Sequence, residues 1–216
     1  MTAPRLTWYF DFVSPYAYLQ FATYPELFRR EFVTLRPVLF AGLLRHWGTK
    51  GPAEVPAKRL HTARHALFRA RELLVPMRYP PAFPFNPLPA LRLASALGAR
   101  VEIVQAIFDF VWKEGRSPND ELSALVGSLG VQDADRLTSD PEVKRALQAS
   151  CDEAIAAGVF GVPTFVARGA GGGAPELFWG VDATPMLLAY LADPALFDDP
   201  EMRRIESLPA GAERRM

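Results

Sequence analysis

The chain has 216 residues, of which half are apolar and 22% are charged, so it can bury a hydrophobic core and is not intrinsically disordered. Its 24 basic and 24 acidic residues give a net charge of zero, which argues against nucleic acid as the main partner. No apolar run reaches the roughly 18 residues that a membrane span needs, so we expect no membrane partner either.

The N-terminal part of the chain alternates between strand and helix patterns. Residues 6–12 are rich in aromatic residues and predict a buried strand. Ser14 and Pro15 follow directly, and this pair suits the N-cap and first turn of a helix over 16–30 that Pro25 interrupts. Residues 32–40 return to a strand pattern in which Pro37 indicates an edge or a bulge. The order predicts a βαβ unit.

The middle of the chain has no strand pattern of comparable strength between residues 42 and 158. Turn signals predict a loop over 42–56, and the alanine- and arginine-rich residues 57–74 predict a helix. Six prolines keep residues 75–89 from forming a regular helix. Helical periodicity then returns over about 90–114, 120–130 and 141–157.

The C-terminal part returns to strand patterns. Strands are predicted near 164–167 and 176–179, with a glycine-rich turn over 169–174 between them, and a helix is predicted over 183–191. The last 20 residues are polar with turn signals, and we expect them to run over the surface. We therefore predict an α/β fold with β-α-β followed by β-β-α. Residues 1–41 and 159–216 form its sheet domain, and 42–158 form an inserted helical domain.

Two short motifs carry candidate chemistry. Ser14 lies where a strand leads into a helix, so its hydroxyl can lie beside unpaired helix N–H groups, a location that favours an anion. The alternative is a plain N-cap. Val162-Pro163 precedes a strand, where a cis proline would expose the neighbouring backbone to an extended ligand. The alternative is an ordinary trans proline in a loop.

These motifs combine into a family resemblance. The segments FDFVSPYAY at 10–18, GVFGVPTF at 158–165 and FWGVD at 178–182 resemble the glutathione-dependent branch of the thioredoxin superfamily. The nearest likeness is to 2-hydroxychromene-2-carboxylate isomerases, with kappa-class glutathione transferases as siblings, within the wider disulfide-bond oxidoreductase A family. The tail LPAGAER at 208–214 fits as well. The resemblance implies a thioredoxin-like fold.

The position of a redox motif in this family is occupied by residues without sulfur. Redox relatives open the first helix with CxxC, whereas this chain has Ser14-Pro15-Tyr16-Ala17, which excludes dithiol exchange by that route. The resemblance implies that Ser14 stabilises the thiolate of bound glutathione. Cys151 is the single cysteine, so the chain has no intramolecular disulfide or multi-cysteine zinc site, and we expect a reducing cytoplasm.

The resemblance also implies the remaining contacts. Asp182 would take the γ-glutamyl ammonium, Lys58 the glycyl carboxylate, and the Val162 backbone the central residue. The glutathione-binding set is Lys58, Val162, Pro163, Trp179, Gly180, Val181 and Asp182. A small aromatic substrate would lie in the helical part, near Phe85 and Asn86, with Arg45 and Lys50 attracting its carboxylate. The alternatives are a helix N-cap at Asp182, solvated lysines and arginines, and a proline-rich loop that packs two aromatic rings.

Departures from the family pattern concern the second substrate more than the thiol. His61, His65 and Phe68-Arg69 stand where the family carries Tyr, Asp and Arg-Trp, while Thr49 and Val181 replace amide residues. We interpret His61 and His65 as surface residues and predict no metal site. Cys151 is interpreted as structural, because its acidic neighbours raise a thiol pKa. Asp11 is expected to orient the turn before Ser14.

Three functions are compatible with these residues. The first is a glutathione-dependent isomerase. The thiolate adds to an unsaturated aromatic oxo-acid, the former double bond of the adduct rotates, and elimination then releases the thiolate. The second is a kappa-like transferase or peroxidase that consumes glutathione. The third is a thioredoxin-fold binding module without catalysis. The resemblance further implies a homodimer.

Overall fold

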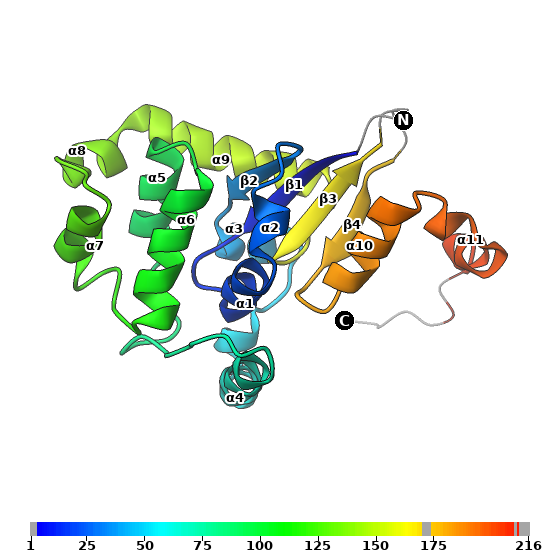
Figure 1. Cartoon of the computed structure of the whole chain (residues 1–216), viewed down its shortest axis with the longest axis horizontal. Helices are drawn as coiled ribbons and strands as arrows, with labels where there is room; N and C mark the ends of the chain where they lie inside the picture. The colour runs from blue at the N-terminus through cyan, green and yellow to red at the C-terminus, as the bar shows by residue number, and fades with distance from the viewer. Residues whose placement is uncertain (1–3, 170–173, 210, 212–216) are drawn as a thin grey trace.

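The sheet has four strands in the order β2-β1-β3-β4. The computed structural model describes residues 4–169, 174–209 and 211. Strand β1 (Arg5–Phe10) pairs in parallel with β2 (Val33–Pro37) and antiparallel with β3 (Thr164–Arg168), which pairs antiparallel with β4 (Glu176–Trp179). Strands from the two ends of the chain thus form one sheet, with β2 at one edge as Pro37 predicted (Figure 1).

One face of the sheet is covered by an aromatic core. Side chains alternate across β1, so Leu6, Trp8 and Phe10 share this face, and the ring of Trp8 stacks on that of Phe10 with centroids 4.4 Å apart. Stacked and edge-to-face aromatic pairs each contribute about 0.5–1.5 kcal/mol beyond the burial of their surface. Helices that contribute to this core include α1 (Pro15–Thr23), α2 (Pro25–Phe28), α6 (Val101–Phe108) and α10 (Thr184–Ala192).

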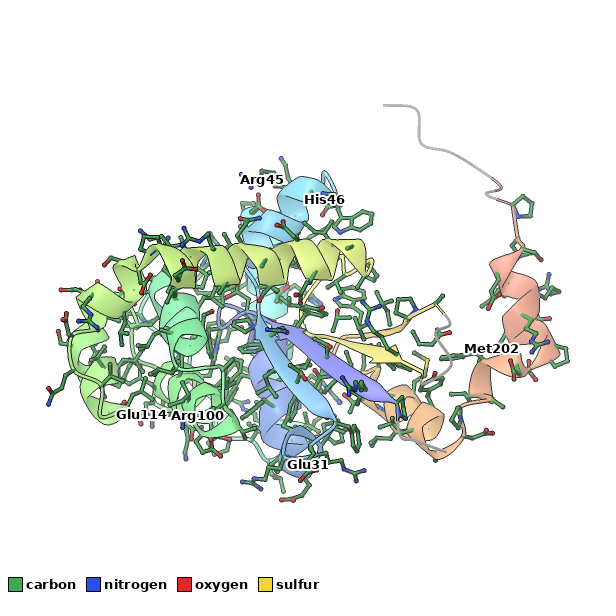
Figure 2. The ribbon with its side chains drawn as sticks, turned by 90° about the horizontal axis from the view of Figure 1, so that it is seen from above. Glu31, Arg45, His46, Arg100, Glu114 and Met202 are labelled. Carbon is green, nitrogen blue, oxygen red and sulfur yellow. The ribbon has the colours of Figure 1, made fainter. Side chains whose placement is uncertain are left out.

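The opposite face carries a smaller core. It contains Tyr9 of β1 and Val166 of β3, packed against α3 (Phe40–His46) and α9 (Pro141–Ala156). Helix α9 contributes Cys151, which is buried, and burial raises the pKa of its thiol. Helices α9 and α1 lie on opposite sides of the strands (Figure 2). The structural interpretation of Cys151 therefore fits its environment.

The helices between residues 88 and 139 form a group beside the sheet, whereas the helix over residues 56–72 lies next to α1 (Figure 1). Helix α6 continues into a π-helical turn over Asp109–Lys113, and a break with positive φ at Gly98 and Ala99 divides α5 from α6. The helical periodicity predicted over about 90–114 therefore belongs to two helices. The remaining elements are α4 (Pro56–Glu72), α5 (Leu88–Ala96), α7 (Leu122–Ser128) and α8 (Ala134–Ser139).

Two segments contain helices that the sequence analysis did not predict, and the helix in the tail is exposed, as expected of a surface segment. The segment 42–56, which was expected to be a loop, contains most of α3 and a 3₁₀ turn at Pro52–Glu54. The sequence did not reveal α3 because no side-chain cap marks its start and tertiary contacts fix it instead. The tail contains a 3₁₀ turn at Leu196–Asp198 and α11 (Pro200–Glu206), which begins with an aspartate N-cap before proline.

Some of the sequence predictions concern residues or a domain division that the structure does not test. Residues 170–173 of the predicted glycine-rich turn and most of the tail motif at 208–214 lie outside the described residues. The division into a sheet domain and an inserted domain at 42–158 stays a prediction. Within the described part of the chain, no helix has both the length and the apolar character needed to cross a membrane.

Candidate active site

Ser14 caps the N-terminus of α1 at the wall of a large cavity. Its hydroxyl accepts a hydrogen bond from the Ala17 N–H at 3.2 Å, which leaves the hydroxyl proton to be donated elsewhere. The nearest protein acceptor is the Val162 carbonyl at 3.5 Å, which is longer than the 2.5–3.0 Å of an ordinary O–H···O bond. The Ser14 hydroxyl is therefore a donor without a strong acceptor among the described residues.

The cavity has a volume of about 990 Å³ and is mostly apolar. It lies between the loop that follows β1, helix α3 with the segment after it, the proline-rich segment near Phe85, and the loop before β3. A volume of this size is enough for a tripeptide or for a small aromatic molecule. Of the predicted site residues, the structure brings together Ser14, Lys50, Phe85, Val162 and Trp179 in its wall.

The segment before β3 forms the cavity wall next to Ser14. The Val162–Pro163 peptide is cis, and no hydrogen-bond partner of the Val162 N–H is found among the described residues. Next to it, the indole of Trp179 lies over Gly161, where a Cβ would come within 2.5 Å of the indole nitrogen. Trp179 also meets the ring of Phe160, with centroids 5.0 Å apart. A backbone N–H that pairs with no described residue therefore lies near both Ser14 and an aromatic surface.

A buried amide positions the loop between β4 and α10. The Trp8 indole donates to Gln20 Oε1 at 2.6 Å, and Gln20 Nε2 donates to the Gly180 carbonyl at 3.1 Å and the Thr184 hydroxyl at 2.8 Å. Gly180 adopts a φ of 92°, which favours glycine, and its N–H bonds to the Pro163 carbonyl. The core of the sheet thus holds the segment that contains Val181 and Asp182.

Asp182 is exposed, and its negative charge affects the pKa of the nearby Tyr16. Its carboxylate is held by no hydrogen bond from another described residue, and α10 begins after it with Ala183 as the N-cap. Burial raises the pKa of the Tyr16 phenol, and the negative charge of Asp182 raises it further. Asp182 is therefore close to the residue that follows Ser14-Pro15, and its charge is available to a cation.

Asp11 is completely buried in the wall of the same cavity. Its two carboxylate oxygens accept hydrogen bonds from the Val13 N–H at 3.0 Å and the Phe40 N–H at 2.9 Å. Burial raises the pKa of this carboxyl to about 7, although both hydrogen bonds oppose the shift. Asp11 orients the turn before Ser14, as predicted, and also ties that turn to the start of α3.

Tyr16 is a cavity residue that the sequence analysis did not single out. Its hydroxyl lies 2.8 Å from His65 Nδ1 on α4, and the rings of His65 and His61 stack with centroids 6.0 Å apart. The tyrosine belongs to the motif after Ser14, and this position was the signal available in the sequence. The pair connects α1 to α4.

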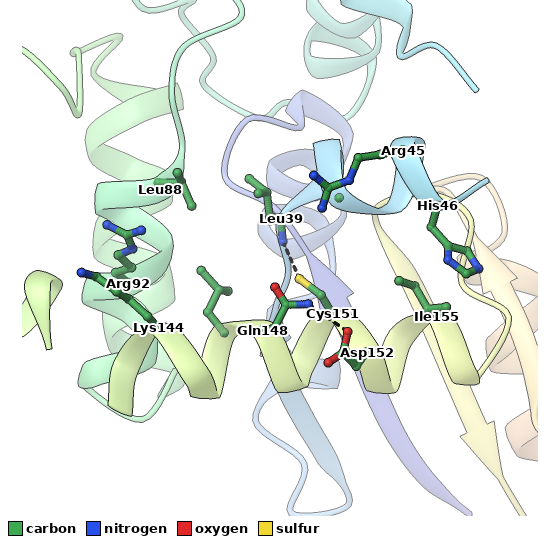
Figure 3. A pocket seen from close by; sticks show the side chains of 12 residues that line it. Leu39, Arg45, His46, Leu88, Arg92, Lys144, Gln148, Cys151, Asp152 and Ile155 are labelled. Carbon is green, nitrogen blue, oxygen red and sulfur yellow. Dashed lines mark hydrogen bonds between the residues drawn. The ribbon is translucent and has the colours of Figure 1, made fainter. Parts of the chain in front are cut away.

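The other seven predicted residues do not line the cavity: Pro163, Gly180, Val181 and Asp182 belong to the neighbouring segments described above, and Lys58, Asn86 and Arg45 lie elsewhere. Lys58 is exposed in the first turn of α4, four residues before Thr62, which lines the cavity, so the two share a helix face. Asn86 is exposed, and its side-chain oxygen accepts from the Leu88 N–H at the start of α5. Arg45 points into a different cavity, on the other side of α3 (Figure 3). The structure therefore does not bring Asn86 or Arg45 to Ser14.

Comparison with known proteins assigns the family. A model of the DSBA-like thioredoxin domain matches residues 5–192. The chain belongs to this family. A solved structure of 2-hydroxychromene-2-carboxylate isomerase has the same fold, with a TM-score of 0.73 and 22% identity over 95% of this chain and 99% of that one. The α/β thioredoxin-like fold and the resemblance drawn from the three motifs are confirmed.

Two curated relatives cover nearly the whole of this DSBA-like chain. It is 27% identical over 207 residues to glutathione S-transferase kappa 2 of Caenorhabditis elegans, with 86% of this chain and 91% of that protein aligned. It is 28% identical over 199 residues to 2-hydroxychromene-2-carboxylate isomerase of Sphingobium xenophagum, with 87% and 98% aligned. Relatives of this DSBA-like protein thus include a glutathione transferase and an isomerase.

Proposed function

We propose that this protein is a cytoplasmic, glutathione-dependent isomerase that acts on an unsaturated aromatic oxo-acid. The observation that carries the proposal is the Ser14 hydroxyl, a donor without a strong protein acceptor, at a helix N-terminus beside a large apolar cavity. The four positions from Ser14 to Ala17 hold no sulfur, so the reactive thiol must come from a ligand. Likeness to a glutathione transferase supports glutathione as that ligand.

The available interactions are large enough to ionise a thiol. Lowering the pKa of a thiol from about 8.5 by two units requires about 2.7 kcal/mol. A hydrogen bond from Ser14 to a thiolate contributes about 1.5–3 kcal/mol, and the N-terminus of α1 adds about 0.3–1 kcal/mol. No metal or basic side chain is needed for this step.

The proposed glutathione contacts surround Ser14. The Val162 backbone, with its unpaired N–H, pairs with the central residue of the tripeptide, and Pro163 holds that edge in place. The exposed Asp182 carboxylate takes the γ-glutamyl ammonium, and Lys58 takes the glycyl carboxylate from α4. The indole of Trp179 and the backbone of Gly180 and Val181 line the approach.

The second substrate occupies the helical side of the cavity. Phe85 and its neighbours give an apolar surface for an aromatic ring, and Lys50 supplies a positive charge for the carboxylate. The thiolate adds to the carbon–carbon double bond, and the electron pair moves onto the conjugated carbonyl oxygen. The former double bond then rotates as a single bond. Return of the electron pair expels the thiolate, so glutathione is regenerated.

The test is the variant Ser14→Ala, with Ser150→Ala on α9 as the control because Ser150 is equally buried and lies outside the cavity. We expect Ser14→Ala to lower glutathione-dependent isomerisation of 2-hydroxychromene-2-carboxylate by roughly one to three orders of magnitude, from loss of a hydrogen bond to a charged group. Ultraviolet absorbance of bound glutathione should show a thiolate in the wild type and less of it in Ser14→Ala. Unchanged turnover and thiolate absorbance would refute the assignment.

The alternative is a kappa-like transferase or peroxidase, which the likeness to the Caenorhabditis elegans transferase favours. Free thiol measured before and after turnover separates the two, because an isomerase returns all of its glutathione and a transferase or peroxidase consumes it. A protein that binds glutathione and leaves its thiol protonated would instead be a binding module. The expected homodimer stays a prediction that light scattering can check.

A further inference from the structure

A second cavity, of about 500 Å³, lies between α3, α5 and α9. Arg92 of α5 and Lys144 of α9 lie together at one end of it, and Arg45 of α3 extends over Leu39 from the opposite side (Figure 3). Leu39 lines both this cavity and the one that contains Ser14, so the two are neighbours on either side of one short segment. The second cavity plays no part in the function proposed above.

The charges around this cavity are not balanced by the protein. Arg45, Arg92 and Lys144 face a single carboxylate, that of Asp152, which accepts a hydrogen bond from Gln148 at 2.9 Å. Within the described part of the chain, none of the three cations belongs to a salt bridge. Two positive charges therefore remain unneutralised around the cavity.

Arg92 supplies a second, independent observation. Its Nε atom is buried and has no hydrogen-bond partner among the described residues. A buried donor on a charged group is costly to leave unpaired, and a guanidinium is well suited to binding an anionic oxygen. The Nε atom is closed off from solvent, but the half-buried Arg92 side chain lines the cavity and its guanidinium makes no hydrogen bond to any described residue, so an anion in the cavity would contact a cation that is otherwise unpaired.

The floor of the cavity limits what the anion can be. Leu39, Leu88, Leu147 and Ile155 line it, so the ligand meets apolar surface between the two charged ends. We propose that this cavity is a second ligand site, which binds a small organic dianion with an apolar body. One anionic group would contact Arg92 and Lys144, and the other would contact Arg45. Burial of the apolar body against the leucines would add to the binding free energy.

Isothermal titration of the full chain with terephthalate tests this site, with terephthalamide as an uncharged molecule of the same shape. We expect terephthalate to bind, terephthalamide to give no heat, and inorganic phosphate to bind at least tenfold more weakly because it lacks the apolar body. Binding should be unchanged in Ser14→Ala and in the presence of glutathione. Competition with glutathione, equal binding of phosphate or of terephthalamide, or no binding of terephthalate at millimolar concentration would overturn the proposal.

Matched variants locate the binding. Lys144→Met and Arg92→Met each keep an apolar side chain and should weaken terephthalate binding by roughly ten- to a hundredfold, the loss of one hydrogen bond to a charged group. Arg145→Met is the control, because Arg145 is the next residue on α9, is exposed, pairs with Glu142 and lies outside the cavity. Lys144 is exposed, so its variant should fold even where Arg92→Met does not. Equal affinity of Lys144→Met and the wild type would contradict the site.

Discussion

The carboxyl group of Asp11 makes the stability of this protein depend on pH. Its pKa is raised to about 7 because burial disfavours the charged form in the folded chain, whereas the ordinary value of 3.8 holds when the chain unfolds. The neutral carboxyl therefore stabilises the fold. This contribution is fully present below pH 3.8 and is lost as the pH rises through about 7.

We predict that the free energy of unfolding of the wild type falls by about 3 kcal/mol between pH 5 and pH 8 through Asp11 alone. Asp11→Asn has no proton to lose, so its unfolding free energy should lack this part of the pH dependence. Urea unfolding of both proteins at the two pH values measures the difference. Parallel pH profiles of the two proteins would show that Asp11 titrates normally in the folded chain.

Single residues could be predicted from the sequence where a motif fixes their backbone position. Ser14, Val162 and Trp179 belong to short motifs at strand ends, and the structure places all three around one cavity. Asn86 was predicted because its segment resembles a family segment near the second substrate, and Arg45 because its charge suits a carboxylate. Neither argument determines which way the side chain points. A helix turn directs Arg45 to the other side of α3, and a local hydrogen bond holds Asn86.

At the scale of elements, Gln20 joins three of them. It connects β1, α1 and the loop before α10 through Trp8, Gly180 and Thr184. Gln20→Leu leaves the Trp8 indole N–H and the Gly180 carbonyl without this partner, so we expect a loss of about 2–4 kcal/mol in unfolding free energy. Urea unfolding measures it, with the exposed Gln148→Leu, expected within about 0.5 kcal/mol of wild type, as the control. Equal effects of the two variants would show that the network adds no stability.

The close approach of β4 to the segment before β3 gives another prediction. A Cβ at Gly161 would come within 2.5 Å of the Trp179 indole nitrogen, so Gly161→Ala must displace the ring. We expect altered tryptophan fluorescence and glutathione affinity lowered by roughly tenfold, the equivalent of about 1.4 kcal/mol. Gly127→Ala on α7 is the control, because nothing lies within 4 Å of its added carbon. An unchanged affinity in Gly161→Ala would remove Trp179 from the glutathione site.

Helices and strands could be predicted where a periodic hydrophobic pattern or a capping residue indicates them. The strands and α4 follow from local sequence. Helix α3 was taken for a loop, because its N-cap Leu39 makes no side-chain capping bond and few of its residues are buried. Its start is fixed by the Phe40 N–H bond to Asp11, and its end by the Trp47 indole, which donates to the Val159 carbonyl at 2.9 Å. Both partners are distant in sequence, so no local signal could reveal them.

At the scale of the whole molecule, the family match ends at residue 192, yet the chain continues into α11 (Figure 2). The segment between holds Phe197, whose ring stacks on those of Phe178 and Tyr190 with centroids 6.0 and 5.5 Å away. Helix α11 itself contains no buried residue. The boundary of the folded unit should therefore lie between Phe197 and α11, beyond the end of the family match.

Two variants test this boundary. Ending the chain after Asp199 removes α11 and should change the unfolding free energy by less than about 1 kcal/mol, since exposed residues contribute little. Phe197→Ala in the full chain removes a ring that packs against the core and should cost about 1–3 kcal/mol, below the range for fully buried rings because Phe197 is only partly buried. Urea unfolding of both variants gives the comparison. A truncation as destabilising as Phe197→Ala would show that α11 is part of the folded unit.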